Sequence, residues 1–168
     1  YIILGEIYAT LKKYDDSIMS YKKVTEIIPN HALAHFNMGH TLQTQGKVKE
    51  AIVAYQQTIR IKPDFPDAHF NLGHALADLG KFSEAIEFYR NAIKIKPDYA
   101  EAYNNLGKAL FESFRSEEAI AAYTKSLSIQ QNSATVYNNM GSALAELGKL
   151  EEALEAYKKA LTLEPNNA

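Results

Sequence analysis

The sequence predicts an all-α fold built from repeated pairs of antiparallel helices. The first observation behind this prediction is a period of 34 residues in the positions of proline, which occurs at Pro29, Pro63 and Pro97 and, two periods later, at Pro165. The second is that glycine and tyrosine keep the same step along the chain: Gly5, Gly39, Gly73, Gly107 and Gly141, and Tyr21, Tyr55, Tyr89, Tyr123 and Tyr157. A fixed period of this length is typical of a repeat array, in which each copy buries its apolar face against its neighbours.

Each copy of the repeat has the pattern of two helices joined by a short turn. In the copy that begins at Pro66, apolar and small residues follow the i, i+3, i+4, i+7 spacing of one helix face. They are His69, Leu72, Gly73 and Leu76. The second helix carries a similar face, formed by Ala85, Tyr89, Ala92, Ile93 and Ile95. Gly80 indicates a turn between the helices, because glycine accepts a positive φ just past a helix end. Pro97 ends the second helix, because proline lacks an N–H donor and disfavours helix at the residue before it.

We expect a single domain, 1–168, of five copies. The first copy is truncated, at 1–31, and four full copies follow it: 32–65, 66–99, 100–133 and 134–167. Tyr1 already occupies the aromatic position of the first copy, so we expect the natural N-terminus to lie further upstream.

The residues in register resemble those of the tetratricopeptide repeat family. In that family an aromatic residue, a Leu-Gly pair, a small residue, a second aromatic, another small residue and a terminal proline recur in order. The copy that begins at Pro66 supplies His69, Leu72-Gly73, Ala85, Tyr89, Ala92 and Pro97. Histidine replaces the usual tryptophan or tyrosine at the first position. The resemblance covers essentially the whole chain and implies a right-handed superhelical α-solenoid, whose first helices line a concave groove. The repeat sequences are also similar to those of O-linked N-acetylglucosamine transferases.

The small residues that recur in each copy have a steric explanation. We expect Gly73 and Ala85 to let the two helices of a copy approach closely. Tyr89 then fills the space that this approach leaves toward the next copy. The recurrent tyrosines should therefore be buried.

The fourth copy, 100–133, departs most from the pattern. It has Phe114 where the other full copies have the turn glycine, and Gln131 where the proline belongs. Because a bulky residue at positive φ is costly, we expect this turn to take another shape. Phe114 can then fill the apolar position that Ser116 vacates, and Ser116 can cap the helix that follows.

The composition excludes several classes of function. The 168 residues carry a formal net charge of −2, so we expect no nucleic-acid partner. Cysteine is absent, which excludes a disulfide framework and thiolate metal ligands. No apolar run approaches the roughly 20 residues of a membrane span, so we expect no membrane partner. Separately, we expect a cytoplasmic location. No motif of a cofactor site or a catalytic site occurs, and we expect no cofactor and no enzymatic activity in this chain.

An asparagine recurs at the sixth position of each full copy, on the face of the first helix opposite its packed side. The four residues are Asn37, Asn71, Asn105 and Asn139. Each amide offers a donor and an acceptor, which suits the unpaired backbone of an extended peptide. The resemblance implies this role, because a similar asparagine ladder holds substrate peptide in the transferase repeats. The alternative is that these asparagines only solvate the groove.

Other positions of the predicted groove vary along the chain. We place Phe36 and Phe70 there as an exposed aromatic patch, with packing against neighbouring copies as the alternative. His40, His74 and Lys108 share the ninth position. Some family members hold a terminal carboxylate with Lys, Asn and Arg at the fifth, sixth and ninth positions, and this chain lacks that set. His40 and His74 lie in successive copies, roughly 16–20 Å apart at twice the helix spacing, so we expect no metal site.

The leading hypothesis for function is a scaffold that binds an extended peptide or a partner helix in the concave groove, without chemistry. The alternative is the substrate-recruiting arm of a larger enzyme such as a glycosyltransferase. Recognition of RNA by helical repeats is disfavoured, because the array lacks a basic surface. We also expect end-to-end self-association through terminal copies that carry no polar closing helix.

Overall fold

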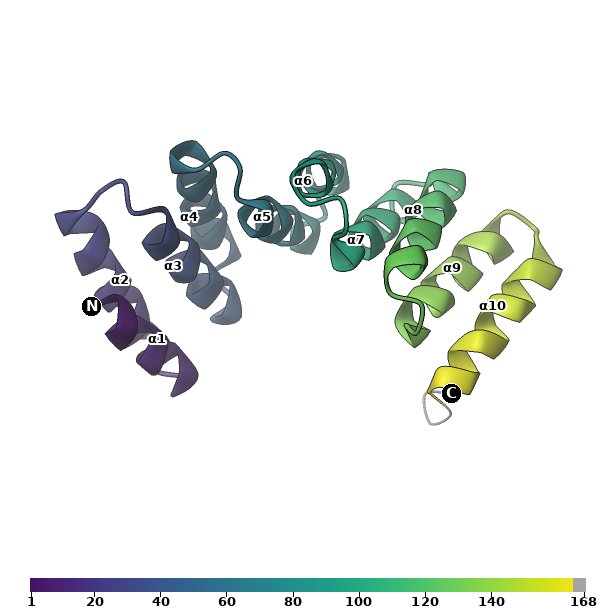
Figure 1. Cartoon of the computed structure of the whole chain (residues 1–168), viewed down its shortest axis with the longest axis horizontal. Helices are drawn as coiled ribbons and strands as arrows, with labels where there is room; N and C mark the ends of the chain where they lie inside the picture. The colour runs from purple at the N-terminus through teal and green to yellow at the C-terminus, as the bar shows by residue number, and fades with distance from the viewer. Residues whose placement is uncertain (165–168) are drawn as a thin grey trace. The chain divides into compact units, whose positions relative to one another are not determined.

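The computed structural model describes residues 1–164 and contains ten α-helices and no strand within that range (Figure 1). The all-α prediction is therefore confirmed. The helices group into two compact units, Tyr1–Lys81 and Phe82–Ala168. Each unit is described by itself below.

The first unit contains five helices in which sequence neighbours pack against one another. They are α1 (Ile2–Thr10), α2 (Tyr14–Ile27), α3 (Ala32–Thr44), α4 (Val48–Ile61) and α5 (Pro66–Asp78). Each helix contacts the next one along the chain, and α3 additionally contacts α1 and α5. The odd-numbered helices thus form one layer of this unit.

The second unit repeats this arrangement. Its helices are α6 (Phe82–Ile95), α7 (Ala100–Phe111), α8 (Ser116–Ile129), α9 (Ala134–Glu146) and α10 (Leu150–Leu163). Successive helices again pack together, and α7 also contacts α9. Helices α3, α5, α7 and α9 start at the first residues of the four full copies. The grouping of five copies into one domain stays a prediction, and Pro165 at its end lies outside the described residues.

Four of the five recurrent tyrosines are the largest fully buried side chains among the described residues. Tyr21, Tyr55, Tyr89 and Tyr123 are each at most 2% exposed, so the prediction of burial is confirmed for them, whereas Tyr157 is half-buried. The structure adds a second steric reason for the recurrent glycine. A Cβ added at Gly39 would lie 2.8 Å from Cε1 of Tyr55. The same conflict arises at three further pairs: Gly5 with Tyr21, Gly107 with Tyr123, and Gly141 with Tyr157. At these positions glycine makes room for the tyrosine ring of its own copy.

The turn of the fourth copy contradicts the prediction that Phe114 changes its shape. Phe114 has φ 59°, in the left-handed region occupied by Gly46 and its equivalents, and it is 87% exposed. The amide N–H of Arg115 donates to Leu110 O at 3.0 Å, as that of Lys47 donates to Leu42 O at 2.9 Å. Lys12, with φ 57°, adopts the same conformation in the first copy. The packing of the helix pair therefore imposes this turn whichever residue occupies it.

Ser116 does not cap the helix as predicted. It is the first residue of α8, and Arg115 holds the N-cap position without a side-chain bond to the helix. The Ser116 side chain is buried and its hydroxyl donates to the Glu146 carboxylate in α9. It joins adjacent copies through a position that is apolar in the other full copies, and Glu117 and Glu118 supply the favourable charge at this N-terminus.

Proline is not required to end the second helix of a copy. Helix α8 ends at Ile129, the position at which α4 ends with Ile61 and α6 with Ile95. Gln130, before Gln131, has φ −125° and ψ 94°, close to the φ −134° and ψ 88° of Lys62 before Pro63. Each full copy thus ends its second helix at one position with or without proline.

Histidine at the first aromatic position has a hydrogen-bonding role. His69 is 7% exposed, and its Nε2 lies 2.8 Å from the carbonyl oxygen of Pro63. His35 is half-buried, with Nε2 3.0 Å from Pro29 O. These rings tie the start of a helix to the turn before it, a contact that a phenylalanine cannot make. His31 is the N-cap of α3, where its Nδ1 accepts from the Ala34 N–H.

Candidate binding face

The predicted site residues lie on the odd-numbered helices, on what we call the odd-helix face. In the first unit this face is carried by α1, α3 and α5, and in the second unit by α7 and α9. Each helix presents its sixth, ninth, twelfth and thirteenth repeat positions there. The two parts of the face differ in their hydrogen bonding.

In the first unit a chain of four polar side chains crosses the odd-helix face. Tyr55 Oη, reaching from α4, donates to Gln43 Oε1 at 3.0 Å. Gln43 Nε2 donates in turn to Asp78 Oδ2 at 3.0 Å, and Asp78 Oδ1 lies 3.7 Å from His74 Nε2. Burial raises the pKa of the Tyr55 hydroxyl. Tyr55, which belongs to the even-numbered helix α4, therefore supports three exposed or half-exposed side chains on the face.

A second contact in this unit joins α1 to α3. Asn37 Nδ2 donates to Glu6 Oε1 at 3.3 Å. Burial, together with the nearby Glu6 carboxylate, raises the pKa of Tyr21. Asn71, one copy further on, is half-buried and makes no side-chain hydrogen bond within the described residues. Its amide is the one in the ladder that retains all of its hydrogen-bonding capacity.

In the second unit the odd-helix face carries a chain of amides. Asn139 Nδ2 donates to Asn104 Oδ1 at 3.2 Å, and Asn104 Nδ2 donates to Asn105 Oδ1 at 3.4 Å. Lys108 is exposed beside them. Ser142 meets the hydroxyl of Tyr157 at 3.1 Å, so a tyrosine again reaches the face from an even-numbered helix.

The predicted aromatic patch is wrong for Phe70 and incomplete for Phe36. Phe70 is 7% exposed. Phe36 is half-buried, with its ring 4.9 Å from Phe65 and 5.9 Å from Tyr55, centroid to centroid. Rings at this position gain more from packing inside the protein than from facing solvent. Phe70 supports the odd-helix face from beneath, whereas Phe36 packs in part and keeps part of its side chain exposed.

Matches to family models identify the repeats. A model described as TPR repeat matches residues 5–46, 44–80 and 73–113, and models described as tetratricopeptide repeat match 100–133 and 134–167. The chain belongs to the tetratricopeptide repeat family. No curated protein matches it at the level of sequence.

Solved structures show the same helical architecture. "Crystal structure of MamA" is 29% identical with a TM-score of 0.94, and the match covers 98% of this chain and 96% of that one. "Crystal structure of YrrB: a TPR protein with an unusual peptide-binding site" is 22% identical with a TM-score of 0.88, over 99% and 86% of the chains. "MamA 41-end from Desulfovibrio magneticus RS-1" is 18% identical with a TM-score of 0.86, over 97% and 96%. The prediction of a tetratricopeptide solenoid is thereby confirmed.

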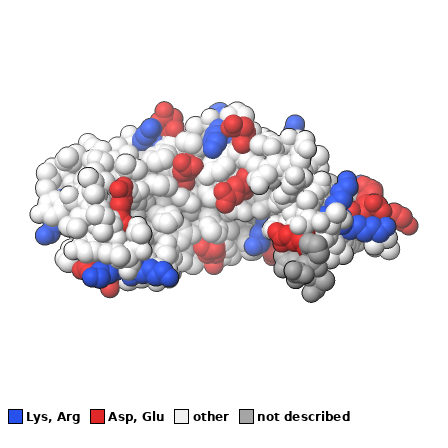
Figure 2. All heavy atoms as spheres, turned by 60° about the horizontal axis from the view of Figure 1, so that its bottom comes forward, with Lys and Arg blue, Asp and Glu red and all other residues white. Residues whose placement is uncertain are grey.

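The charges of this tetratricopeptide protein are mixed in sign. Figure 2 shows acidic and basic side chains interspersed over the visible face, among large uncharged areas. Across residues 1–164 no group of three or more histidine, aspartate or glutamate side chains is arranged to hold a metal ion, and His40 is simply exposed. Within the same range, no helix has both the length and the apolar character to cross a membrane.

The repeat pattern did not predict several hydrogen bonds of the face. Glu6, Gln43 and Asp78 bond across copies, and the tyrosine hydroxyls reach the face from the other layer. Polar residues at the ninth, twelfth and thirteenth positions were the available signal. Which of them meet depends on side-chain reach between neighbouring helices, which a repeat pattern does not specify.

Proposed function

We propose that this chain is a protein-interaction scaffold that binds an extended peptide or a partner helix along the odd-helix face. The observation that carries the proposal is the state of the ladder asparagines. All four are half-buried, so part of each side chain remains open to solvent. The similarity to YrrB, which is described as a protein with a peptide-binding site, supports the same class of function.

The two parts of the face suit different sections of a ligand. Asn71 can donate to and accept from one peptide unit, since its amide is not used inside the protein. Asn105 receives the Asn104 amide through Oδ1, which leaves its own N–H groups for a carbonyl oxygen. His40, His74 and Lys108 lie beside the ladder, where they can meet side chains of the ligand. Phe36 and Phe70 act beneath it by holding the helices in place.

A selected peptide tests this proposal. Random twelve-residue peptides are selected for binding to the whole chain, and the tightest is titrated calorimetrically. Asn71→Ala with Asn105→Ala should weaken binding, because each backbone hydrogen bond contributes about 0.5–1.5 kcal/mol, or about two- to tenfold in Kd. Asn91→Ala, exposed on α6, is the matched control and should leave the affinity unchanged. Equal affinity for the double variant and the parent would remove the ladder from the mechanism.

A substrate-recruiting arm of a glycosyltransferase-like enzyme is the second candidate. The similarity of the repeat sequences to those of O-linked N-acetylglucosamine transferases favours this function. The asparagine ladder would then hold the acceptor peptide. The complete coding sequence separates the two functions. A transferase domain following the array would support recruitment, and an array with no catalytic neighbour would support the free scaffold.

Exposed apolar side chains on the first and last helices support self-association. Ile3 of α1 and Leu11 directly after it are 72% and 60% exposed, and Leu150 and Leu154 of α10 are 63% and 54% exposed. We propose that these surfaces meet between copies of the chain. Leu154→Lys should then lower the weight-average mass seen by light scattering at high concentration, and a mass that stays monomeric in the parent would contradict the proposal.

A further inference from the structure

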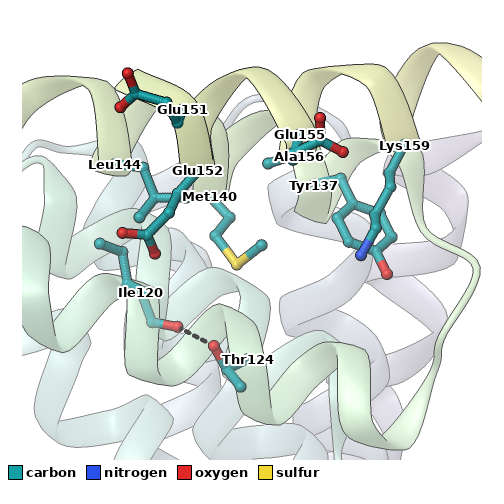
Figure 3. A pocket seen from close by; sticks show the side chains of 10 residues that line it. All are labelled: Ile120, Thr124, Tyr137, Met140, Leu144, Glu151, Glu152, Glu155, Ala156 and Lys159. Carbon is teal, nitrogen blue, oxygen red and sulfur yellow. Dashed lines mark hydrogen bonds between the residues drawn. The ribbon is translucent and has the colours of Figure 1, made fainter. Parts of the chain in front are cut away.

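The second unit has a cavity away from the odd-helix face. It lies between α8 and α10 over α9 and has a volume of about 460 Å³ (Figure 3). Its floor is apolar and is formed by Ile120, Met140, Leu144 and Ala156. Its rim carries three glutamates of α10, Glu151, Glu152 and Glu155, and Lys159 closes one end above the ring of Tyr137. We call this cavity the α8–α10 groove.

The same repeat positions one copy earlier are bridged by an ion pair. There Arg90 of α6 reaches Glu118 of α8, with Nη2 3.4 Å from Oε2. Arg115 completes the pairing of Glu118 with a contact of 2.7 Å from its Nε. A guanidinium thus spans the space between successive even-numbered helices, with its charge held on a glutamate.

In the α8–α10 groove this ion pair is absent, because the equivalent residues differ. Thr124 occupies the position of Arg90, and its hydroxyl bonds back to Ile120 O at 2.8 Å, so it does not reach α10. Glu152 occupies the position of Glu118 and has no ion-pair or hydrogen-bond partner within the described residues. Glu151 next to it is likewise unpaired, whereas Glu155 is held by Lys158 at 3.0 Å. In Figure 3 the Glu152 side chain runs from α10 toward Ile120, over the mouth of the cavity.

We propose that the α8–α10 groove docks a basic amphipathic helix of a partner protein, which supplies the guanidinium that Thr124 cannot. Apolar side chains of that helix enter the cavity over Met140, whose flexible thioether adapts to varied shapes. An arginine beside them pairs with Glu152 and Glu151. The site is distinct from the odd-helix face, so the chain can hold a peptide and a helical partner together.

The probe for this proposal is a synthetic helical peptide of 16 residues. It carries leucine at i, i+3, i+4 and i+7 and arginine on both flanks of that stripe. One comparison peptide has glutamate in place of arginine, and another has the same composition in scrambled order. Calorimetry at about 0.15 M salt suppresses long-range attraction between exposed charges. The designed peptide should bind one chain saturably, at least tenfold more tightly than either comparison peptide.

Two substitutions test the location by using the repeat as its own control. Thr124→Arg rebuilds the internal bridge and should weaken binding at least tenfold. Arg90→Thr removes the bridge one copy earlier but leaves Glu118 paired with Arg115, so it is the matched control and should leave peptide binding unchanged. Both positions are exposed, so neither change should disturb folding. Binding that is unaffected by Thr124→Arg, or the absence of saturable binding, would overturn the proposal.

Methionine methyl resonances locate the peptide independently of affinity. The chain has three methionines, and Met38 of α3 holds the repeat position that Met140 holds in α9. The groove position of Thr124 is Lys22 in the first copy, and that of Glu151 is Lys49 in the second, so the equivalent site near Met38 is less acidic. The Met140 signal, assigned with Met140→Leu, should shift on binding while that of Met38 stays. A shift confined to Met38 would contradict the assignment.

Discussion

The second and fourth copies of the repeat have the same backbone but differ in the residues that were expected to shape it. The turn of the second copy uses Gly46 at φ 81°, and that of the fourth uses Phe114 at φ 59°. The second copy ends its last helix before Pro63, and the fourth ends it before Gln131. In both, a tyrosine ring lies against a glycine of the same copy. The comparison teaches that this tyrosine–glycine contact is the common element, and that the turn and proline signals follow the packing.

The largest expected effect is the loss of either buried tyrosine. Tyr55→Ala and Tyr123→Ala should each lower the free energy of unfolding by about 3–5 kcal/mol, because each deletes a buried aromatic ring. Denaturant titration of the two variants would measure this. Similar losses would support the conclusion that the same tyrosine–glycine contact stabilises both copies. A loss below about 1 kcal/mol at Tyr123 alone would contradict it, because the fourth copy would then depend on other contacts.

The next effect is overpacking at the partner glycines. A Cβ at Gly107 would lie 2.6 Å from Tyr123, and one at Gly39 would lie 2.8 Å from Tyr55. Both rings are fully buried and have little room to shift. Gly39→Ala and Gly107→Ala should therefore each cost about 1–3 kcal/mol. Gly46→Ala tests a different effect, since its Cβ meets no atom within 4 Å and only the positive φ is unfavourable.

A smaller effect of opposite sign is expected at the irregular turn. Phe114→Gly should stabilise the protein by about 1–2 kcal/mol, because a non-glycine residue in the left-handed region costs about that amount. The exposed Phe114 ring contributes little packing that would be lost. Thermal unfolding should show a raised midpoint. A lowered midpoint would mean that the phenylalanine makes a stabilising contact and that the two turns are not equivalent.

The smallest effect concerns alkaline pH. Burial raises the pKa of Tyr55 and of Tyr123 in the folded state, and the Glu112 carboxylate adds to the shift at Tyr123. A raised folded pKa favours the neutral hydroxyl, so this stability is fully present below the unfolded pKa of about 10 and is lost as the pH rises above it. Tyr55→Phe and Tyr123→Phe should each reduce the alkaline loss of stability. Unfolding curves at about pH 8 and about pH 11, on either side of the unfolded pKa, would measure the difference.

Most of the fold follows from the sequence, because a 34-residue period reports the helix pairs directly. The burial of Tyr21, Tyr55, Tyr89 and Tyr123 follows from their register. The turn at Phe114 could not be predicted in the same way. Its intrinsic cost of about 1–2 kcal/mol is small beside the packing energy of the helix pair that forces it. A local backbone preference does not reveal whether that cost or the packing energy is larger.

The position of the candidate face could be predicted from the sequence, but the hydrogen bonds among its side chains could not. The ladder asparagines lie on the helices that their register indicates. The sequence left open whether the aromatic residues beside them face solvent or pack, and the structure buries Phe70 and half-buries Phe36. The contacts among Gln43, Asp78 and Tyr55 depend on how far side chains reach between copies, and only coordinates show that.

The hydrogen bond between Tyr55 and Gln43 has an optical consequence. The chain contains 11 tyrosines and no tryptophan, so phenol groups dominate its near-ultraviolet emission and no indole masks them. Tyr55 joins the buried layer to the odd-helix face through its hydroxyl. A ligand that displaces Gln43 changes the surroundings of that phenol, so the protein carries an intrinsic reporter of occupancy that needs no added label.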